Sequence, residues 1–310
     1  MIEIYFAAHA DRWKDYEKPL CRALDLTGFD YHLSPECDDP AAVDYIVHAP
    51  NGPLSDFTPF TRTKAVLSLW AGVETIIDNE TLTQPLARMV DNDLTRGMVE
   101  WVTGHVMRHH LGMDAHICGQ NGVWAPRVPP LARDRTVAIL GLGALGQACA
   151  YILSELGFEI HGWSRTAKDL RAITCHSGEI GLKETLALAE ILVLLLPLTR
   201  ETENLINGKR LALMPRGGVI LNPGRGALID DVALLSALKS GQIGHATLDV
   251  FREEPLPPDH PYWANPGVTV TPHIASETRP DSASRVIVEN IRRGEAGAPF
   301  MNLVDRAAGY

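Results

Sequence analysis

The sequence predicts an α/β protein of two domains, each built on a parallel sheet with helices on its faces. The chain of 310 residues is long enough for two domains of about 100–200 residues each. Short apolar runs alternate with helical patterns along most of the chain, as strands and helices do in a doubly wound sheet. In addition, a glycine-rich turn at Gly141–Gly146 separates one apolar run from the helical pattern that follows it.

Composition and charge limit the kinds of partner that this chain can bind. Lys and Arg number 28 against 38 Asp and Glu, a net charge of −10, which leaves no broad positive surface for nucleic acid or an anionic membrane. The amino-terminal residues lack a signal-peptide pattern, and the longest apolar run, residues 191–198, is too short to span a bilayer. Five scattered cysteines without a Cys-x-x-Cys pair are typical of reduced thiols. We therefore expect a cytoplasmic protein.

The first hundred residues contain short apolar runs that predict strands, with amphipathic stretches between them. Tyr16, Leu20, Ala23 and Leu24 form one apolar stripe at helical spacing, although Pro19 is poorly tolerated inside a helix. The expected strands cover residues 2–8, 43–48 and 65–69, the expected helices cover residues 13–26 and 95–111, and a loop rich in Pro, Gly and Arg covers residues 119–135.

From residue 136 onward, buried-type strands and helices alternate regularly, as a doubly wound parallel sheet requires. The expected strands cover residues 136–140, 158–163, 191–196, 218–222, 245–250 and 268–271, and the expected helices cover residues 145–156, 182–189, 202–214 and 230–240. A last helix, residues 281–293, is expected to return to the first domain. The predicted domains are therefore residues 1–97 with 278–310, and residues 98–277.

The turn Gly141-Leu-Gly-Ala-Leu-Gly146 predicts a dinucleotide site of the Rossmann type. In such a turn Gly141 allows the tight bend, Gly143 lets the main chain approach a pyrophosphate, and Gly146 lets helix and strand pack closely. A glycine-rich turn without a ligand is the alternative, but the strand before it, the helix after it and the next strand favour the dinucleotide. The predicted contacts are Gly141, Leu142, Gly143, Ala144, Leu145 and Gly146.

The end of the following strand favours NADP(H) over NAD(H). An NAD site places a carboxylate about 20 residues after the turn, on the ribose hydroxyls. This chain has Ser164, Arg165, Thr166 and Lys168 there instead. A hydroxyl and a guanidinium bind a 2′-phosphate, which a carboxylate would repel. NAD(H) remains possible, because Arg165 alternatively lies in solvent or stacks on adenine without selecting the cofactor.

Three polar residues at the ends of successive strands suit the reduction of a 2-oxo acid. Arg225, in Asn222-Pro-Gly-Arg-Gly226, would hold the carboxylate and the carbonyl with its fixed charge. His273, in Thr271-Pro-His-Ile-Ala275, would donate the proton, and Glu254 would keep that imidazole charged. Each of the three alone has a structural alternative, but their placement at strand ends favours catalysis.

With these segments the chain resembles the D-2-hydroxyacid dehydrogenase family. The segments that carry the resemblance are Gly141–Gly146, Leu196–Thr199, Thr202–Asn207, Asn222–Ile229, Leu248–Pro257 and Thr271–Ala275. Trp163–Arg165, Thr278–Pro280 and the tail from Val304 are similar to the glyoxylate/hydroxypyruvate reductase A branch of that family, which uses NADPH. The resemblance implies a Rossmann cofactor domain, a smaller flavodoxin-like α/β substrate domain, and a homodimer that uses residues 95–111 and 119–131.

The resemblance also implies roles for individual residues. Arg225, Glu254 and His273 would be catalytic, with His273 as the acid and base. The cofactor would be lined by Leu196, Pro197, Thr202, Asn222, Pro223, Gly224, Asp249 and Ala275. The substrate would meet Trp70, the main-chain amides of Ala71 and Gly72, the side chains of Arg225 and His273, and Arg279 at the rim.

Departures from the family pattern lie in the first domain and concern the substrate. Trp70 is bulky where many members carry a small residue, Glu74 replaces the more common Asp, and residues 48–52 lack an expected tryptophan. Two alternatives stay open at this point: oxidation of another small acid such as formate or phosphite, and a nucleotide-sensing protein without turnover. No metal site is expected, because adjacent His109 and His110 make a poor chelate and are interpreted as surface or interface residues.

Overall fold

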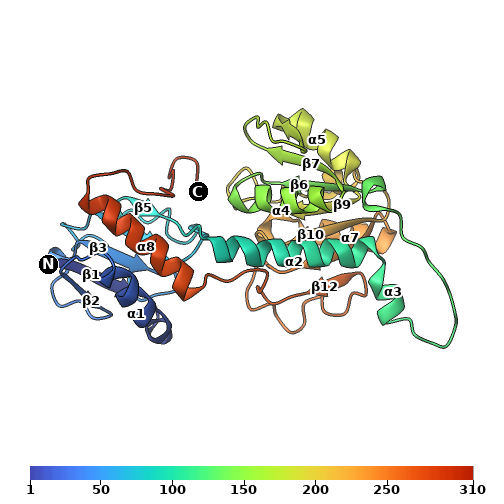
Figure 1. Ribbon diagram of the computed structural model, residues 1–310. Helices are drawn as coiled ribbons and strands as arrows, with labels where there is room; N and C mark the ends of the chain where they lie inside the picture. The colour runs from blue at the N-terminus through green and yellow to red at the C-terminus, as the bar shows by residue number, and fades with distance from the viewer. Residues whose placement is uncertain (310) are drawn as a thin grey trace. The chain divides into compact units, whose positions relative to one another are not determined.

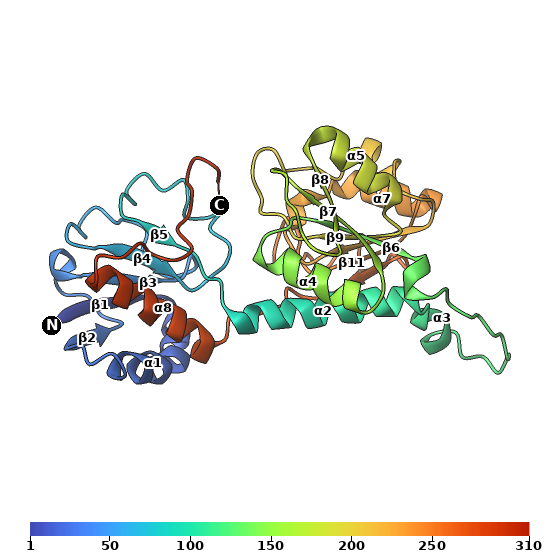
Figure 2. The ribbon, with the colours of Figure 1, turned by 45° about the horizontal axis from the view of Figure 1, so that its top comes forward.

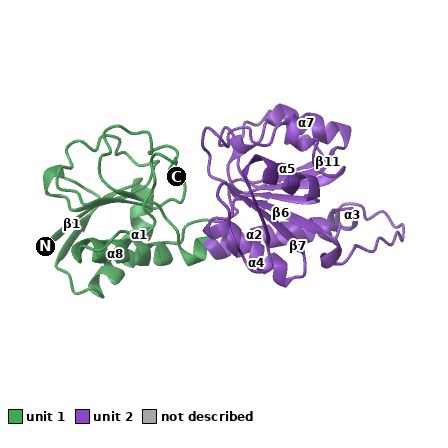
Figure 3. Cartoon of the chain, turned by 90° about the horizontal axis from the view of Figure 1, so that it is seen from above, with its two compact units in different colours: residues 1–94, 277–310 green, residues 95–276 purple. Residues whose placement is uncertain are grey.

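The computed structural model describes residues 1–309, and its helices and strands are shown in Figures 1 and 2. The chain forms two compact units, each with its own parallel sheet (Figure 3). Unit 1 consists of residues 1–94 and 277–310, and unit 2 consists of residues 95–276. The division falls after residues 94 and 276, whereas the sequence pattern places it after residues 97 and 277.

The sheet of unit 1 has five parallel strands in the order β2-β1-β3-β4-β5. This is the strand order of flavodoxin-like proteins, as the sequence predicts for the smaller domain. The strands are β1 (Ile2–Ala7), β2 (Tyr31–Ser34), β3 (Tyr45–His48), β4 (Ala65–Ser68) and β5 (Leu86–Ala87).

Two helices from opposite ends of the chain lie side by side on one face of this sheet (Figures 1 and 2). They are α1 (Ala10–Asp25), which contains Pro19, and α8 (Pro280–Glu295). Leu20 and Leu24 of α1 and Ile287 and Ile291 of α8 are buried together against the alternate strand residues that face them. Irregular segments cover the other face, where Phe57 and Leu82 belong to a second core.

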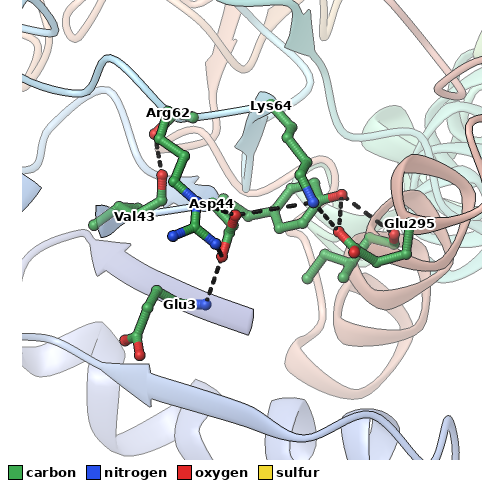
Figure 4. Close-up of polar contacts among 9 residues, drawn as sticks. Glu3, Val43, Asp44, Arg62, Lys64 and Glu295 are labelled. Atoms are coloured by element: carbon green, nitrogen blue, oxygen red, sulfur yellow. Dashed lines mark hydrogen bonds and ion pairs between the residues drawn. The ribbon is translucent and has the colours of Figure 1, made fainter. Parts of the chain in front are cut away.

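A network of charges at the amino ends of β3 and β4 fixes α8 to the sheet (Figure 4). The buried carboxylate of Asp44 accepts hydrogen bonds from Arg62 Nε at 3.0 Å and Nη2 at 3.2 Å. Lys64 Nζ and the Tyr45 hydroxyl both donate to Glu295 Oε1 at 2.7 Å. These groups stabilise the unit. Because they lie at the amino ends of the strands, they do not occupy the carboxyl edge of the sheet.

Unit 2 contains a seven-stranded parallel sheet in the order β12-β11-β10-β9-β6-β7-β8. Read from β8, this is the Rossmann order 3-2-1-4-5-6 with one further strand, which confirms the predicted fold class. The strands are β6 (Thr136–Leu140), β7 (Glu159–Ser164), β8 (Thr174–Ser177), β9 (Ile191–Leu194), β10 (Gly218–Asn222), β11 (Ile243–Leu248) and β12 (Val268–Val270).

Helices cover both faces of this sheet, because successive residues of its strands point to opposite sides. Val137 and Ile139 of β6 face α2 (Asn92–His110) and α4 (Ala144–Glu155). Ala138 and Leu140 face the core that α5 (Gly178–Leu188) and α7 (Asp231–Ser240) complete. The short helices are α3 (Met113–Ile117), α6 (Gly208–Leu211) and the 3₁₀ turns η1 (Pro40–Ala42), η2 (Ala132–Asp134) and η3 (Gly226–Leu228). No helix within residues 1–309 is both long and apolar enough to cross a membrane.

The predicted helix at residues 202–214 is wrong. The Ile206 amide donates to the Leu228 carbonyl at 2.9 Å, and Ile206 forms a β-bridge with Ile229. Asn204 has a left-handed backbone, φ 50°, and Asn207 then caps the single turn of α6. Pairing with a distant segment therefore outweighs the local helical pattern.

Candidate active site

The glycine-rich turn links β6 to α4 beside β9, at the point where the strand order of the sheet reverses. Gly141 has φ +107°, and a Cβ atom there would overlap the Leu195 carbonyl oxygen after β9. A Cβ atom on Gly146 would overlap the Gly141 carbonyl oxygen. A side chain at either position would thus push the turn, the helix and β9 apart.

The start of α4 fits the pyrophosphate of a dinucleotide. Gly143 is the N-cap of α4 and no side chain caps the helix, so its first amides have no partner within the helix. Gly143 and Ala144 are exposed, and a Cβ atom on Gly143 would meet nothing within 4 Å. Leu142 is buried against Gly162 of β7 and holds the turn on the sheet. Free amides at a helix start with open space before them are a site for phosphate.

The segment after β7 presents the groups that the sequence assigns to the 2′-phosphate. Ser164 is buried, and its hydroxyl donates to the Thr166 carbonyl at 2.8 Å, which turns the chain after the strand. Arg165, Thr166 and Lys168 are exposed. The positive charge of Arg165 also helps to lower the pKa of Glu201, whose lowering comes first from hydrogen bonding by its own amide and by Thr199.

Two loops after β9 and β10 are shaped by their own polar side chains. The Thr202 hydroxyl donates to the Pro197 carbonyl and accepts from the Thr199 amide, both at 2.7 Å. The buried Asn222 side chain accepts from the Gly224 amide at 3.2 Å and donates to the Arg225 carbonyl at 2.9 Å. Leu196, Pro223 and Gly224 are buried within these loops. Hydrogen bonds within each loop therefore fix the main chain that carries the residues assigned to the cofactor.

His273 and Glu254 form a directly bonded pair. His273 Nδ1 lies 2.6 Å from Glu254 Oε2, and the other carboxylate oxygen accepts from the Phe251 amide at 2.8 Å. The hydrogen bond to Glu254 raises the pKa of His273, against the opposing effect of burial. Burial raises the pKa of Glu254, but the hydrogen bonds from His273 and the Phe251 amide outweigh it and lower that pKa overall. A charged imidazole that leaves Nε2 free for a substrate is suited to proton transfer.

Asp249 holds the His273 segment in place through hydrogen bonds. Its buried carboxylate accepts from the Thr271 hydroxyl at 2.6 Å and from the amides of Ile274 and Ala275 at 2.9 Å. The His273 amide donates to the Asp249 carbonyl at 2.8 Å, and His273 has a left-handed backbone with φ 54°. Such strain in a residue other than glycine persists only where its surroundings fix it, and it gathers at functional sites. Both oxygens of the Asp249 carboxylate thus accept hydrogen bonds from within the protein.

Arg225 follows β10 and lies within electrostatic range of the pair. Its Nη1 donates to the Gly224 carbonyl at 2.7 Å. Its positive charge contributes to the lowered pKa of Glu254 and acts against the raised pKa of His273. A cation, an acid and a carboxylate therefore gather at the carboxyl ends of β10, β11 and β12.

In unit 1, the segment after β4 carries the predicted substrate residues. Trp70 is 37% exposed, and its carbonyl and amide bond to Met89 and Ser68. Among residues 1–309, no protein group accepts a hydrogen bond from the amides of Ala71 and Gly72. Arg279 is exposed at the N-cap of α8.

Comparison with known proteins identifies the family. A family model described as the NAD binding domain of D-isomer specific 2-hydroxyacid dehydrogenases matches residues 103–275. The glyoxylate/hydroxypyruvate reductase A of Yersinia enterocolitica is 39% identical over 255 residues, which cover 80% of this chain and 82% of that protein. This chain belongs to the D-2-hydroxyacid dehydrogenase family.

Solved structures of other family members match nearly the whole chain. A D-isomer specific 2-hydroxyacid dehydrogenase from Xanthobacter autotrophicus, in complex with NADPH and MES, has a TM-score of 0.92 and 39% identity and covers 99% of both chains. The NADPH-dependent glyoxylate/hydroxypyruvate reductase from Sinorhizobium meliloti, in complex with NADP and sulfate, has a TM-score of 0.87 and 32% identity and covers 100% of both chains. The family resemblance seen in the sequence, and its glyoxylate/hydroxypyruvate reductase A branch, are thus confirmed.

His109 and His110 of this dehydrogenase, which the sequence analysis expects to be surface or interface residues, point into unit 2. His110 is buried against Phe158, and His109 Nε2 lies 2.9 Å from the Thr247 hydroxyl on β11. The end of α2 packs along the sheet, so both rings turn inward. Within residues 1–309, no three His, Cys, Asp or Glu side chains are grouped in a way that could hold a metal ion.

The sequence analysis missed two features of the site. It does not assign Thr271 to the Asp249 carboxylate, and it gives no role to Arg252, which donates to the Ile229 carbonyl. A signal for the first was available, because a buried Asp at a strand end needs donors, and Thr271 follows the neighbouring strand. No local pattern pointed to Arg252.

Proposed function

We propose that this protein is an NADPH-dependent reductase of short 2-oxo acids such as glyoxylate or hydroxypyruvate. The observation that carries the proposal is the His273–Glu254 pair, 2.6 Å apart at the sheet edge that also holds the glycine-rich turn. The names of the relatives and the NADPH and NADP in the two solved structures support the same reaction.

In this reaction, C2 of the acid receives a hydride, which is what a bound NADPH supplies. Glu254 favours the charged form of His273 by raising its pKa, and His273 gives its Nε2 proton to the carbonyl oxygen as negative charge develops there. Arg225 stabilises the same oxygen and holds the carboxylate with its planar donors. The neutral imidazole that remains then takes a proton from solvent before the next turnover.

Each unit is assigned its own ligand. We assign unit 2 to the cofactor, held by residues 141–146 and by the loops after β7, β9 and β10. We assign unit 1 to the substrate, because the free amides of Ala71 and Gly72 suit a carboxylate. Trp70 and Arg279 would limit the size and charge of the acid.

The preference for NADP(H) is assigned to the segment after β7. Arg165 and Lys168 are exposed cations, and Ser164 and Thr166 supply hydroxyls. Residues 164–168 contain no carboxylate to repel a 2′-phosphate. NAD(H) lacks that phosphate and would gain less from these groups.

The decisive experiment is the optical rate of NADPH and NADH oxidation by the purified protein with glyoxylate and with hydroxypyruvate. Faster oxidation of NADPH with either acid is the expected result. Reduction of only bulkier 2-oxo acids would move the substrate toward groups that stack on Trp70. If no 2-oxo acid is reduced but formate or phosphite reduces NADP, the proposed reaction is wrong, and binding of NADPH without any turnover would indicate a sensor.

We also propose a homodimer and a cytoplasmic location. The segment between α3 and β6 exposes large apolar side chains, with Trp124 94% and Val128 93% exposed, which are typical of a protein interface. All five cysteines are unpaired, as is usual in a reducing compartment.

A further inference from the structure

The loops that carry Arg225 and Glu254 meet at their main chains. Gly226 follows Arg225 directly, and a Cβ atom on it would overlap the main chain of Phe251. The Phe251 amide in turn donates to Glu254 at 2.8 Å. Any sliding of one loop along the other would therefore move Arg225 relative to Glu254.

Beside this contact, both loops line one pocket, so side-chain contact does not continue between them. The pocket has a volume of about 190 Å³, and its lining includes Asn222, Gly226 and Ile229 around Arg225 and Val250, Phe251 and Leu256 around Glu254. Close-packed interiors fix side chains by contact, whereas a cavity wall lacks those contacts.

The side chain of Arg252 spans this pocket. Its Nη2 donates to the Ile229 carbonyl at 2.7 Å and to the Ala227 carbonyl at 3.3 Å, and it also bonds to the side chain of Asn204. Both carbonyls belong to the turn that follows Arg225, and the Leu228 amide of that turn donates back to the Arg225 carbonyl. Arg252 thus bonds to the Arg225 loop from within the Glu254 loop.

Carboxylates hold the guanidinium in this orientation. Arg252 Nε lies 3.5 Å from Asp231 Oδ2 and Nη1 lies 3.5 Å from Glu203 Oε1. The buried Tyr262 hydroxyl donates to the other oxygen of Asp231 at 2.8 Å, which fixes that carboxylate. The planar fork of arginine can serve two carbonyls and two carboxylates at once, and a lysine ammonium cannot.

We propose that Arg252 is a positioning residue that sets the register between the Arg225 loop and the Glu254 loop. It touches no reacting atom and acts through the main chain of both loops. The inference rests on the proposed function for its effect on turnover, but its effect on the His273–Glu254 pair can be measured without turnover.

The test compares Arg252→Met and Arg252→Lys with a matched control, Arg210→Met. Arg210 is also a partly exposed bridge in unit 2, from Nη1 to the Leu205 carbonyl at 3.0 Å and from Nη2 to Glu179 at 2.9 Å. In Arg252→Met we expect kcat to fall by roughly 10²-fold, the loss typical of a catalytic group displaced by about 1 Å. Affinity for NADPH, followed by nicotinamide fluorescence, should stay unchanged, Arg252→Lys should recover part of kcat, and Arg210→Met should keep kcat.

A second readout is the pKa of the His273 imidazole, followed by NMR and assigned with His273→Ala. Glu254 raises this pKa, so loosening the Glu254 loop should lower it in Arg252→Met and leave it unchanged in Arg210→Met. A wild-type pKa and kcat in Arg252→Met would overturn the inference, as would equal losses in both methionine variants. If the wild-type protein reduces no 2-oxo acid, the proposed function fails, and the NMR titration alone still decides the role of Arg252.

Discussion

His273 occupies a backbone conformation that its side chain does not favour, and the protein maintains it with buried hydrogen bonds. Asp249 supplies most of these, while Glu254 holds the ring at 2.6 Å. The direction of the ring is therefore set before any substrate arrives. Preorganisation of this kind is how a single residue lowers a barrier.

Replacing His273 by Ala should lower kcat by about 10²–10⁴-fold, the contribution of a positioned general acid. Affinity for NADPH should change little, because the imidazole transfers a proton and the glycine-rich turn holds the phosphates. Steady-state kinetics with glyoxylate, beside a fluorescence titration with NADPH, would check both parts. Unchanged turnover would exclude His273 as the acid.

Glu254→Gln tests the role of the carboxylate beside His273, and its effect depends on pH. Reduction needs the protonated imidazole, so kcat/KM is highest below the pKa of His273 and falls as the pH rises through it. Glu254 raises that pKa, and the glutamine variant should therefore lose activity at a lower pH than the wild type. A fall at the same pH in both proteins would rule out the role of Glu254.

Replacing Arg165 by Asp should weaken NADPH selectively. The new carboxylate would repel the 2′-phosphate that the guanidinium is proposed to bind, whereas NADH carries no such group. The ratio of kcat/KM for NADPH to that for NADH is the measurement. Lys168→Asp, three residues further along the exposed segment, tests in the same way whether the second cation assigned to this segment also contributes. Equal losses with the two cofactors would place the phosphate elsewhere.

At the scale of the element, the junction between β6 and α4 depends on main-chain contact. Gly146→Ala should destabilise unit 2 by about 1–3 kcal/mol, as overpacking does, and should abolish dinucleotide binding. The added Cβ would overlap the Gly141 carbonyl and open the turn. Gly104→Ala is the matched control, because a Cβ atom at that exposed position of α2 meets nothing within 4 Å. It should stabilise the helix by about 1 kcal/mol. Thermal unfolding of both variants, with and without NADPH, would measure their stability and their binding of the dinucleotide.

The carboxyl-terminal part of α2 carries half-buried histidines that should make unit 2 sensitive to acid. Burial, followed by the charges of His245 and Arg108, lowers the pKa of His109 to about 3, while Asp114 acts in the opposite direction. Burial, followed by the charge of Arg108, also lowers the pKa values of His105 and His245.

The unfolded chain therefore binds more protons than the folded one between about pH 6.5 and the lowered pKa of His109. The free energy of unfolding should fall as the pH decreases through this range, by up to about 1.4 kcal/mol per pH unit for one such group. His109→Gln, whose amide can still bond to Thr247, should flatten the dependence. Urea unfolding at several pH values measures it, and an equally steep loss in the variant would contradict the argument.

At the scale of the whole molecule, the segment between α3 and β6 extends from the body of unit 2 in both ribbon views (Figures 1 and 2). It exposes Val123 and Trp124 together, at 70% and 94%. In the proposed homodimer these side chains are covered by the second copy. Light scattering should give twice the mass of the chain, and Trp124→Asp should shift the protein toward the monomer. A monomeric wild type would refute the dimer.

The sequence by itself determined the features that depend on local chain chemistry. Short apolar runs and helical patterns located most strands and helices, and the glycine spacing located the turn after β6. Residues at successive strand ends, Arg225, Glu254 and His273, could be chosen because parallel strands end at one edge of a sheet. These three residues lie at the same edge because the strands are parallel, and the alternation of strands and helices in the sequence already implies parallel strands.

Only the tertiary structure decided what depends on partners distant in the sequence. The short strands β2, β5 and β8 carry little pattern of their own and exist because a neighbouring strand pairs with each. The pairing of Ile206 with the Leu228–Ile229 segment replaced a predicted helix, and the packing of α2 along the sheet turned His109 toward β11. The left-handed backbone of His273 and the contacts of Arg252 likewise come from hydrogen bonds across many residues. Such bonds form only after the chain has folded, so no local pattern in the sequence encodes them.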